Sequence, residues 1–432
     1  MQASAANLLA RDRVIAGVEK LRFFPLAVER GHGSWLVEAG GRELLDLSAS
    51  WTACGLGHGH PAVAAALARA SAAAPGASIL SAVHPEAVAL AEELLEVLPG
   101  AGERRVYLGH AGSDANDVAI RCALHATGRP RVAAFEGSYH GGLGIAMRAS
   151  GVHVATGNVG VSQEIAFTPY PEPYRDPEGR YAEVLASLGQ VLVDRDVACL
   201  LVEPIMSDGG LVVPPDGFLR EVADRCRETG TLLICDEVKV GLGRTGLLHA
   251  FQHDRISPDL VTFGKSLGAG VPLSAIVGPA TVLDAPSAGA LLTTAGNPWS
   301  AAVGRAVLRT ISDEGLAERA AAAGARLRSG LQQAIAGLDA VGDVRGRGLA
   351  IGIDLVEDRQ SKARAGRLAA RAAYRAWQLG CVVHYVGGNV LEVTPPLVIT
   401  DAEVDRAVEL LTGAIATAGR VNEEEVAPYA GW

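Results

Sequence analysis

The feature that most constrains the fold is an alternation of short apolar runs with amphipathic stretches between about residues 46 and 295. The apolar runs read RVYLG, RVAAFEG, VACLLVEPI, TLLICDEV and DLVTFG. The stretches between them, such as DANDVAIRCALHATG and GFLREVADRCRETG, have the spacing of helices. Strands that alternate with helices predict an α/β fold, in which a mainly parallel sheet is covered by helices on both faces.

The length of 432 residues favours two domains. We expect a large domain over residues 46–295 and a smaller α+β domain over residues 296–432, which begins with one long helix and continues into strands. Residues 1–45 contain a Gly-Gly pair between two short apolar runs, which predicts a hairpin, and we expect this segment to join the small domain.

Composition excludes several classes of function. The formal net charge of -10 argues against nucleic acids and anionic membranes as partners. The N-terminus lacks the pattern of a signal peptide, and no window approaches the ~18 apolar residues of a membrane span. Six cysteines are scattered without a CxxC pair, which favours buried thiols in a cytoplasmic protein over disulfides or a zinc site. We therefore expect a cytoplasmic protein without a metal.

Lysine is rare, so chemistry that needs an amine has four candidates: Lys20, Lys239, Lys265 and Lys362. Lys265 directly follows an apolar strand in TFGKSLGAG, and its neighbouring glycines let the backbone pass close to a bound group. A lysine held at a strand end in a partly dry site has a lowered pKa and can form an imine. From this motif alone, an ordinary surface lysine is equally compatible with the sequence.

Other strand ends carry groups that suit a phosphorylated aromatic cofactor. Asp236 ends LLICDEV and could pair with a pyridinium nitrogen, or it could be an ordinary capping aspartate. Gly112, Ser113 and Asp114 open a helix whose N-terminus could seat a phosphate, although a simple Ser or Asp cap is the alternative. Tyr139 could stack on a planar ring or belong to the core. Because ligands bind beyond the carboxyl ends of parallel strands, we expect these loops to converge.

Taken in order, these motifs resemble the class III (ω-type) aminotransferases, which are pyridoxal-phosphate enzymes of fold type I. The motifs that carry the resemblance are GHGHP (57–61), GSDANDVAIR (112–121), SYHGG (138–142), VEPI with the following GG and GFL (202–219), CDEVKVGLGRTG (235–246), TFGKSLGAGVPLSA (262–275), TTAGNP (293–298) and RGRGL (345–349). They span most of the chain. The GLGRTG segment also matches the GxGxxG pattern of dinucleotide sites, but we expect a tight loop there because no helix opens at it.

The resemblance implies a role for each matching residue. Lys265 would hold pyridoxal 5'-phosphate as a Schiff base and move the proton during catalysis. Asp236 would pair with the pyridine nitrogen, and Tyr139 and Val238 would pack on the two faces of the ring. Gly112 and Ser113 would bind the phosphate, and Glu203 would support the network of Tyr139 and Asp236. Thr293 would reach the phosphate of the neighbouring subunit, which implies a homodimer with shared active sites.

Three residues depart from the family pattern. Glu392 stands where many members have a carboxylate-binding arginine, Asp208 lies where some members have an acid that masks this arginine, and Lys239 replaces a glutamine that contacts the cofactor. Two carboxylates would favour an amine-rich substrate such as an aminosugar, an aminoglycoside or a polyamine, and Trp51 could stack on a sugar face. Alternatively, Glu392 points away from the substrate. A keto acid would need a cation, for which Arg148 and Lys239 are candidates.

The sequence therefore predicts a transaminase (EC 2.6.1 type), which moves an amino group from a primary amine to the cofactor and then to a keto acid or carbonyl acceptor. Its place would be in aminoglycoside biosynthesis. An epimerase, racemase or eliminase on the same scaffold is the alternative, since the sequence does not show which substrate bond is broken. A binding protein without catalysis is disfavoured, because Lys265 and Asp236 are both present.

Overall fold

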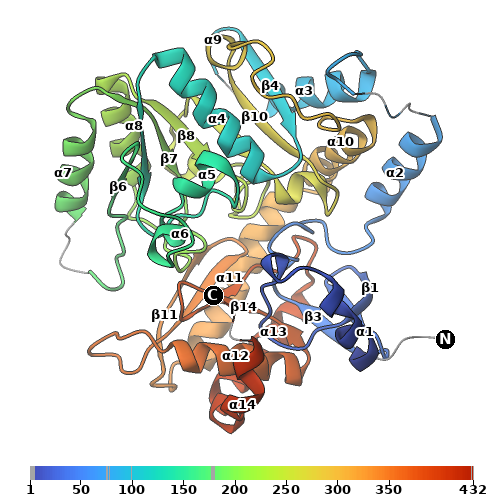
Figure 1. The fold of residues 1–432 in the computed structure, drawn as a ribbon. Coiled ribbons are helices and arrows are strands. Elements are labelled where there is room, and N and C mark those ends of the chain that lie inside the picture. The colour runs from blue at the N-terminus through green and yellow to red at the C-terminus, as the bar shows by residue number, and fades with distance from the viewer. Residues whose placement is uncertain are drawn as a thin grey trace. The chain divides into compact units, whose positions relative to one another are not determined.

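The computed structural model describes residues 5–73, 76, 78–98, 100–176, 181–429 and 431. The chain forms two compact units (Figure 1). Unit 1 combines Met1–His60 with Glu318–Trp432, and unit 2 is Pro61–Ala317.

The boundaries of the units lie further along the chain than residues 46 and 296, where the sequence pattern changes. Residues 46–60 are held in unit 1 by hydrogen bonds such as the 2.8 Å bond from Leu397 N to Gly55 O. At the other boundary, α10 (Pro298–Asp313) packs on α2 (Pro61–Ala73) and α3 (Pro85–Val97) and so belongs to unit 2.

Unit 2 is built on a seven-stranded sheet with the order β4-β10-β9-β8-β7-β5-β6. The strands are β4 (Arg104–Gly109), β10 (Ser274–Pro279), β9 (Leu260–Phe263), β8 (Leu232–Asp236), β7 (Val197–Val202), β5 (Arg131–Phe135) and β6 (Ile165–Thr168). Strand β10 runs antiparallel to both of its neighbours, β4 and β9, and the other neighbouring strands of this sheet pair in parallel. The prediction of an α/β fold with a mainly parallel sheet is confirmed.

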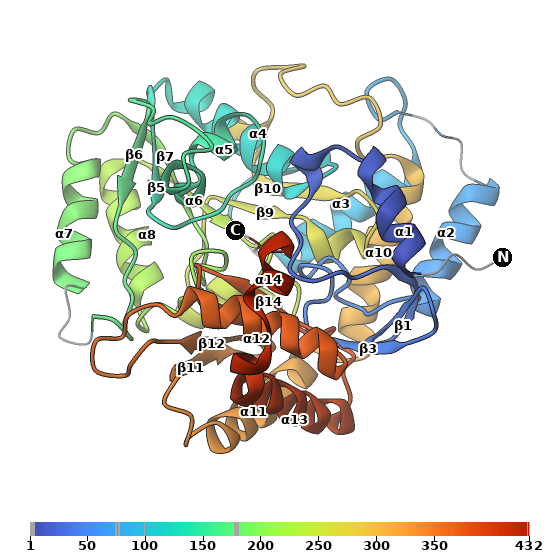
Figure 2. The same cartoon turned by 60° about the horizontal axis from the view of Figure 1, so that its bottom comes forward.

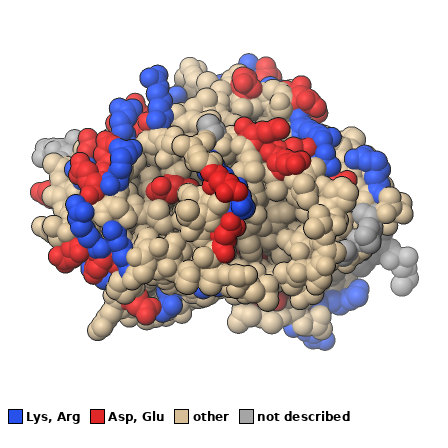
Figure 3. Space-filling model, turned by 90° about the horizontal axis from the view of Figure 1, so that it is seen from above, with Lys and Arg blue, Asp and Glu red and all other residues tan. Residues whose placement is uncertain are grey.

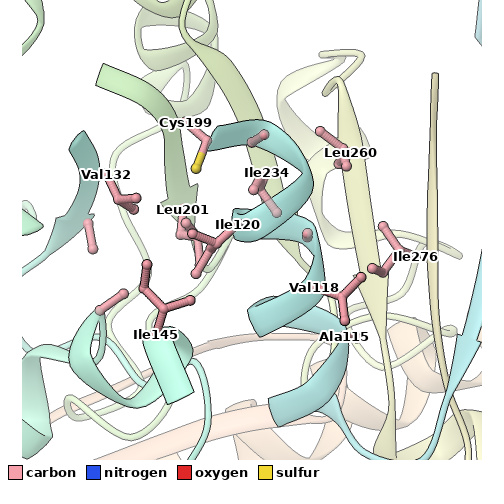
Figure 4. Close-up of a cluster of buried hydrophobic side chains, with 14 of the residues drawn as sticks. Ala115, Val118, Ile120, Val132, Ile145, Cys199, Leu201, Ile234, Leu260 and Ile276 are labelled. Atoms are coloured by element: carbon pink, nitrogen blue, oxygen red, sulfur yellow. The ribbon is translucent and has the colours of Figure 1, made fainter. Parts of the chain in front are cut away.

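The core of unit 2 fixes the position of α4 (Gly112–Thr127), as Figure 4 shows. Ala115, Val118 and Ile120 of this helix are buried in one cluster with side chains of six strands. The strand residues in the cluster are Val132, Ile165, Cys199, Leu201, Ile234, Leu260 and Ile276. Burial of each large aliphatic side chain stabilises the fold by roughly 1.5–3 kcal/mol. Because α4 directly follows β4, its N-terminus lies at the carboxyl end of that strand.

Unit 2 also contains shorter and longer helices beside those already named. They are α5 (Gly144–Arg148), α6 (Gly151–Ala155), α7 (Tyr181–Leu192), α8 (Phe218–Thr229), α9 (Ala280–Leu283) and the 3-10 helix η3 (Ala250–Asp254). In Figure 1, α7 and α8 lie at the β6 side of the sheet, whereas α9 and α10 lie at the β4 side.

Unit 1 contains two four-stranded sheets, ordered β1-β2-β3-β13 and β11-β12-β15-β14. Their strands are β1 (Val28–His32), β2 (Trp35–Glu38), β3 (Glu43–Asp46), β13 (Cys381–Val382), β11 (Val341–Arg347), β12 (Ala350–Leu355), β15 (Val390–Val393) and β14 (His384–Val386). The predicted Gly-Gly hairpin is present, because Gly40 and Gly41 join β2 to β3. Helices α12 (Gly366–Leu379) and α13 (Asp401–Thr417) pack together, as Figure 2 shows.

The long helix predicted after residue 296 is wrong, since the structure has two helices there. Gly315 has a φ of 58° and separates α10 from α11 (Leu316–Ala334). A left-handed residue cannot continue a right-handed helix, and glycine adopts this conformation without a steric penalty.

Figure 3 shows basic and acidic side chains lying beside one another on one face of the molecule, without a broad basic surface on that face. Among the described helices, none is both long enough and apolar enough to cross a membrane.

Candidate active site

Asp236 is the centre of a buried polar network at the carboxyl end of β8. Its Oδ2 accepts hydrogen bonds from Asn116 Nδ2 at 2.7 Å and from His140 Nδ1 at 2.8 Å. Its Oδ1 accepts one from the backbone N–H of Val238 at 3.0 Å. Asp236 is only 4% exposed. The carboxylate is therefore held in one orientation by donors from three separate segments.

Asn116 and His140 are functional candidates that the sequence argument missed. Asn116 Nδ2 also donates to the carbonyl of His140 at 2.8 Å, and Asn116 Oδ1 accepts from Thr262 Oγ1 at 2.7 Å. Both residues lie inside motifs that were already singled out. Asn116 stands one helical turn after Gly112, and this spacing was the available signal.

Lys265 lies directly after β9, as the sequence predicted, and begins the 3-10 helix η4 (Lys265–Gly268). It is half-buried and has a φ of 38°. Non-glycine residues rarely adopt this left-handed conformation, and such strain concentrates at functional sites. The backbone thus turns sharply where the amine would bind a cofactor.

The backbone is closely packed where η4 approaches the N-terminus of α4. A Cβ atom added to Gly112 would lie 2.5 Å from Val238 Cγ1, and one added to Gly264 would lie 2.9 Å from Gly112 N. Ser113 Oγ accepts a hydrogen bond from Gly142 N at 3.1 Å. Gly112, Ser113, Val238 and the start of η4 therefore meet, and glycine is required for this approach.

Asp114 acts as a cap for α4. Its Oδ2 accepts from the backbone N–H groups of His110 at 2.8 Å and Ala111 at 3.1 Å, while its Oδ1 accepts from Ser274 Oγ at 2.7 Å. The sequence left open whether Asp114 caps the helix, and the structure shows that it does. The first backbone N–H groups of the helix have no intrahelical acceptor, and such a terminus can bind an anion.

Glu203 supports the segment that carries Tyr139. Its Oε2 accepts from Tyr139 N at 3.1 Å, and its Oε1 accepts from Ser207 N at 3.2 Å. Burial raises the pKa of Glu203 to about 7. The ring of Tyr139 lies 5.4 Å from that of His153, and burial also raises the pKa of Tyr139.

Lys239 and Asp208, two of the residues that depart from the family pattern, form a buried ion pair. Lys239 Nζ lies 3.1 Å from Asp208 Oδ1, and the two side chains are 6% and 8% exposed. Burial acts to raise the pKa of Asp208, but the charges of Lys239 and then Lys265 outweigh it and hold that pKa below its usual value. Asp208 is therefore a carboxylate within the electrostatic reach of both lysines.

Two other predicted residues lie apart from this network. Arg148 ends α5 and is exposed to solvent on a surface where its Nη1 lies 3.1 Å from Glu164 Oε2. Thr293 is exposed in the loop before α10. The structure thus gives Arg148 a surface ion pair and leaves Thr293 accessible in the single chain.

Trp51 and Glu392 belong to unit 1. The Trp51 ring stacks on His384, with ring centroids 4.5 Å apart and an interplanar angle of 29°. Glu392 lies on β15 and is 2% exposed. In the sheet register it is the partner of His384 on β14. These three residues therefore form one group within unit 1.

The donor set in unit 2 fits pyridoxal 5'-phosphate. It combines an amine at Lys265, an oriented carboxylate at Asp236 and a helix N-terminus at Gly112. These are the groups needed for an imine, for a protonated pyridine nitrogen and for a phosphate, respectively. Among the described residues, no cluster of His, Cys, Asp and Glu could hold a metal ion.

Comparison with known proteins agrees with this fit. The isoleucine 2-epimerase of Lentilactobacillus buchneri is 35% identical over 418 residues, covering 93% of this chain and 92% of that protein. The 4-aminobutyrate aminotransferase of Mycobacterium bovis is 33% identical over 412 residues, covering 91% of each. An ornithine aminotransferase structure from Toxoplasma gondii, with pyridoxal phosphate at partial occupancy in its active site, has a TM-score of 0.85 and 28% identity, covering 97% of this chain and 96% of that chain.

The family model described as aminotransferase class III matches residues 16–415, which is nearly the whole chain. The resemblance read from the motifs is therefore confirmed. The chain belongs to the class III aminotransferases and is a pyridoxal-phosphate-dependent enzyme of this transaminase family.

Proposed function

We propose that this enzyme is an amino-acid racemase or epimerase, which inverts the configuration at the Cα of a free amino acid. The observation that carries the proposal is the buried ion pair in which Asp208 Oδ1 lies 3.1 Å from Lys239 Nζ, because it provides a carboxylate in addition to the amine of Lys265. The site would then hold two groups able to carry a proton where transamination needs one.

Inversion at Cα requires one group that removes the proton and another that delivers a proton from the opposite side. Lys265 Nζ is the first candidate, and a carboxylate oxygen of Asp208 is the second. When bound, the cofactor supplies the electron sink that makes the Cα proton acidic. In the ionised form that Lys239 favours, Asp208 could remove the Cα proton of one isomer while the protonated amine of Lys265 delivers a proton to the opposite face. The carboxyl group protonated in this way would deliver its proton in the reverse direction, in which Lys265 is the base.

The known relatives support the proposal without deciding it. The isoleucine 2-epimerase and the 4-aminobutyrate aminotransferase are 35% and 33% identical to the chain. This difference is too small to separate the two reactions. The buried Lys239–Asp208 pair is a specific feature of the site, and it gives the epimerase reaction its second proton carrier.

A second candidate is an aminotransferase for an amine-rich substrate, such as an aminosugar. Glu392, buried on β15 shortly before the Pro395-Pro396-Leu397 motif, favours it. The ion pair with Lys239 offsets the charge of Asp208, however, so Asp208 adds little attraction for a cationic substrate. We therefore rank it second.

The reactions are distinguished by giving the holoenzyme one amino acid and no keto acid. L-isoleucine, L-leucine and L-alanine would each be incubated in D2O, with chiral chromatography and mass spectrometry of the recovered amino acid. A racemase produces the isomer inverted at Cα, labelled with deuterium, while the cofactor spectrum returns to its starting form. Accumulation of the pyridoxamine form near ~330 nm without inverted product, or turnover of an aminosugar donor alone, would favour the aminotransferase.

Asp208→Asn tests the assignment of the second proton carrier. We expect inversion to fall by about 10²- to 10⁴-fold, the usual contribution of a general acid or base. Deuterium should still enter the unreacted isomer, because Lys265 remains. Asp208→Glu, which keeps the acid, is the matched control, and Lys265→Ala should lose both signals. Unchanged inversion in a folded Asp208→Asn variant would remove Asp208 from the mechanism.

A further inference from the structure

Thr262 and Asn116 form a chain of hydrogen bonds that ends at the carboxylate of Asp236, and all three residues belong to unit 2. Thr262 Oγ1 donates to Asn116 Oδ1 at 2.7 Å, and Asn116 Nδ2 donates to Asp236 Oδ2 at 2.7 Å. Thr262 and Asn116 are 0% and 1% exposed. Since water has little access to this chain, its polar groups depend on one another for hydrogen bonds.

The neighbours of Asn116 permit only one orientation of its amide. Asn116 Nδ2 faces two oxygens that accept, namely the backbone carbonyl of His140 at 2.8 Å and the carboxylate of Asp236. If the amide were turned over, its oxygen would face both of these acceptors, and two hydrogen bonds would be lost. The amide oxygen must therefore face Thr262, whose hydroxyl is the donor that this buried oxygen requires.

The sheet fixes the position from which Thr262 donates. Thr262 on β9 is the register partner of Asp236 on the parallel strand β8. Its backbone carbonyl accepts a hydrogen bond from Glu237 N at 3.0 Å. Asn116 is carried by α4, which is held on the same sheet by its buried side chains. The chain of hydrogen bonds therefore connects three elements whose backbones are independently fixed.

We propose that Thr262 and Asn116 are positioning residues, which keep Asp236 as a carboxylate of fixed orientation for the pyridine nitrogen of the cofactor. Hydrogen bonds donated to a carboxylate favour its ionised form, and an ionised Asp236 keeps a pyridine nitrogen beside it protonated. Without the hydroxyl of Thr262, Asn116 Oδ1 would be buried without a donor, and the amide would have to move away from Asp236 to reach one.

Both residues act through Asp236 rather than on the reacting atoms. The inference concerns the cofactor site and is therefore independent of whether the enzyme catalyses racemisation or transamination. It predicts that the hydroxyl of a buried strand residue changes how strongly the protein prefers a cofactor that has a ring nitrogen.

The test measures this preference by exchange on the holoenzyme. The protein with bound pyridoxal phosphate is equilibrated with the analogue in which C–H replaces the ring nitrogen, and mass spectrometry of the released ligands gives the ratio of the two affinities. Only pyridoxal phosphate can pair with Asp236, so the ratio reports this contact, whereas contacts with the phosphate and with Lys265 are common to both ligands. Asp236→Asn shows how far the ratio falls when the contact is lost.

Thr262→Val keeps the shape of the side chain and removes the hydroxyl. We expect the ratio to fall about 10-fold, because the hydrogen bond from Asn116 to the charged Asp236 is weakened. Thr262→Ser keeps the hydroxyl and should recover most of the ratio. Thr168→Val is the matched control, since Thr168 is also 0% exposed on a strand of this sheet and its hydroxyl donates to Ser187 Oγ at 3.2 Å. The control should change the ratio less than about 2-fold.

A second variant tests the middle of the chain. Asn116→Ala removes the whole amide and should lower the ratio at least as far as Thr262→Val, so it decides the question if Thr262→Val does not fold. A general loss of stability would weaken the binding of both ligands equally and leave the ratio unchanged. An unchanged ratio in either folded variant, no recovery in Thr262→Ser, or an equal fall in Thr168→Val would overturn the inference.

Discussion

At the scale of single residues, the contact of His58 Nε2 with the buried Asp46 Oδ2, 2.7 Å long, leads to a prediction about pH. Burial opposes the charge on His58, but hydrogen bonds with Asp46 and Cys54 outweigh it and raise the pKa of the imidazole to about 9. Since this pKa is above the unfolded value of about 6.5, the pair stabilises the fold fully below that pH. The stabilisation is lost as the pH rises through about 9.

We therefore expect the unchanged protein to lose on the order of 3 kcal/mol of unfolding free energy between pH 6 and pH 10 in excess of any loss in His58→Gln. Urea unfolding of both proteins across this range measures the difference. Glu203, whose pKa is about 7, titrates in both proteins, so its contribution cancels when their unfolding free energies are subtracted. Parallel pH profiles for the two proteins would show that the pair contributes nothing.

Residue identity was more predictable than residue pairing. The sequence drew attention to Lys239 and Asp208 separately, because each departs from the family pattern, but not to the 3.1 Å contact between them. That contact joins residues 31 positions apart and depends on how two loops meet. For the same reason, the expected pair of carboxylates could not be assessed until the partner of Asp208 was known.

At the scale of elements, the start of α4 offers a test of the phosphate seat. Gly112→Ala would place a Cβ 2.5 Å from Val238 Cγ1, so Val238 or the helix must move. We expect weaker binding of pyridoxal phosphate and a loss of about 1–3 kcal/mol in stability, as for other overpacked sites. Gly189→Ala in α7 is the control, because a Cβ there meets nothing within 4 Å. Cofactor titration and thermal unfolding measure both effects, and normal binding in Gly112→Ala would contradict the assignment.

Elements with a strong periodic pattern were predicted well, and special backbone conformations were not. The strands ending at Asp236 and before Lys265 were identified because apolar runs of this length have few alternatives. The turn at Ala49–Thr52, whose four residues have φ angles between 46° and 67°, was not predicted. None of these residues is a glycine, the residue type that would indicate a positive φ. The buried carboxylate of Asp46 accepts hydrogen bonds from the backbone N–H groups of Ser48 and Ala49 at the start of this turn, and residue types alone do not predict these bonds.

At the scale of the whole molecule, the division of the chain followed contacts rather than composition. Helix α10 lies in the segment that was expected to begin the small C-terminal domain, yet it packs on α2 and α3 of unit 2. Residues 46–60 similarly stay with unit 1 through bonds such as that from Thr394 N to Leu47 O at 2.7 Å. Sequence patterns located the elements, but which unit they join depends on packing between segments far apart in the chain.

The homodimer expected from Thr293 remains a proposal, which subunit mixing can test. One variant carries Lys265→Ala and the other carries Thr293→Glu, whose added carboxylate should repel the cofactor phosphate. If Thr293 completes the site of the neighbouring subunit, a mixed dimer contains one site with both changes and one with neither. Refolding the two inactive proteins together in equal amounts should then restore about a quarter of the normal activity, since half of the dimers are mixed.

If Thr293 instead served its own subunit, every site in the mixed dimer would carry one change, and no activity would return. Light scattering should show particles of twice the 44.6 kDa chain mass in the unchanged protein. Because Thr293 is exposed in the single chain, a partner could reach it without any rearrangement of α10. Restored activity would therefore identify Thr293 as a residue that acts across the subunit interface, and a dimer without restoration would place it in its own subunit's site.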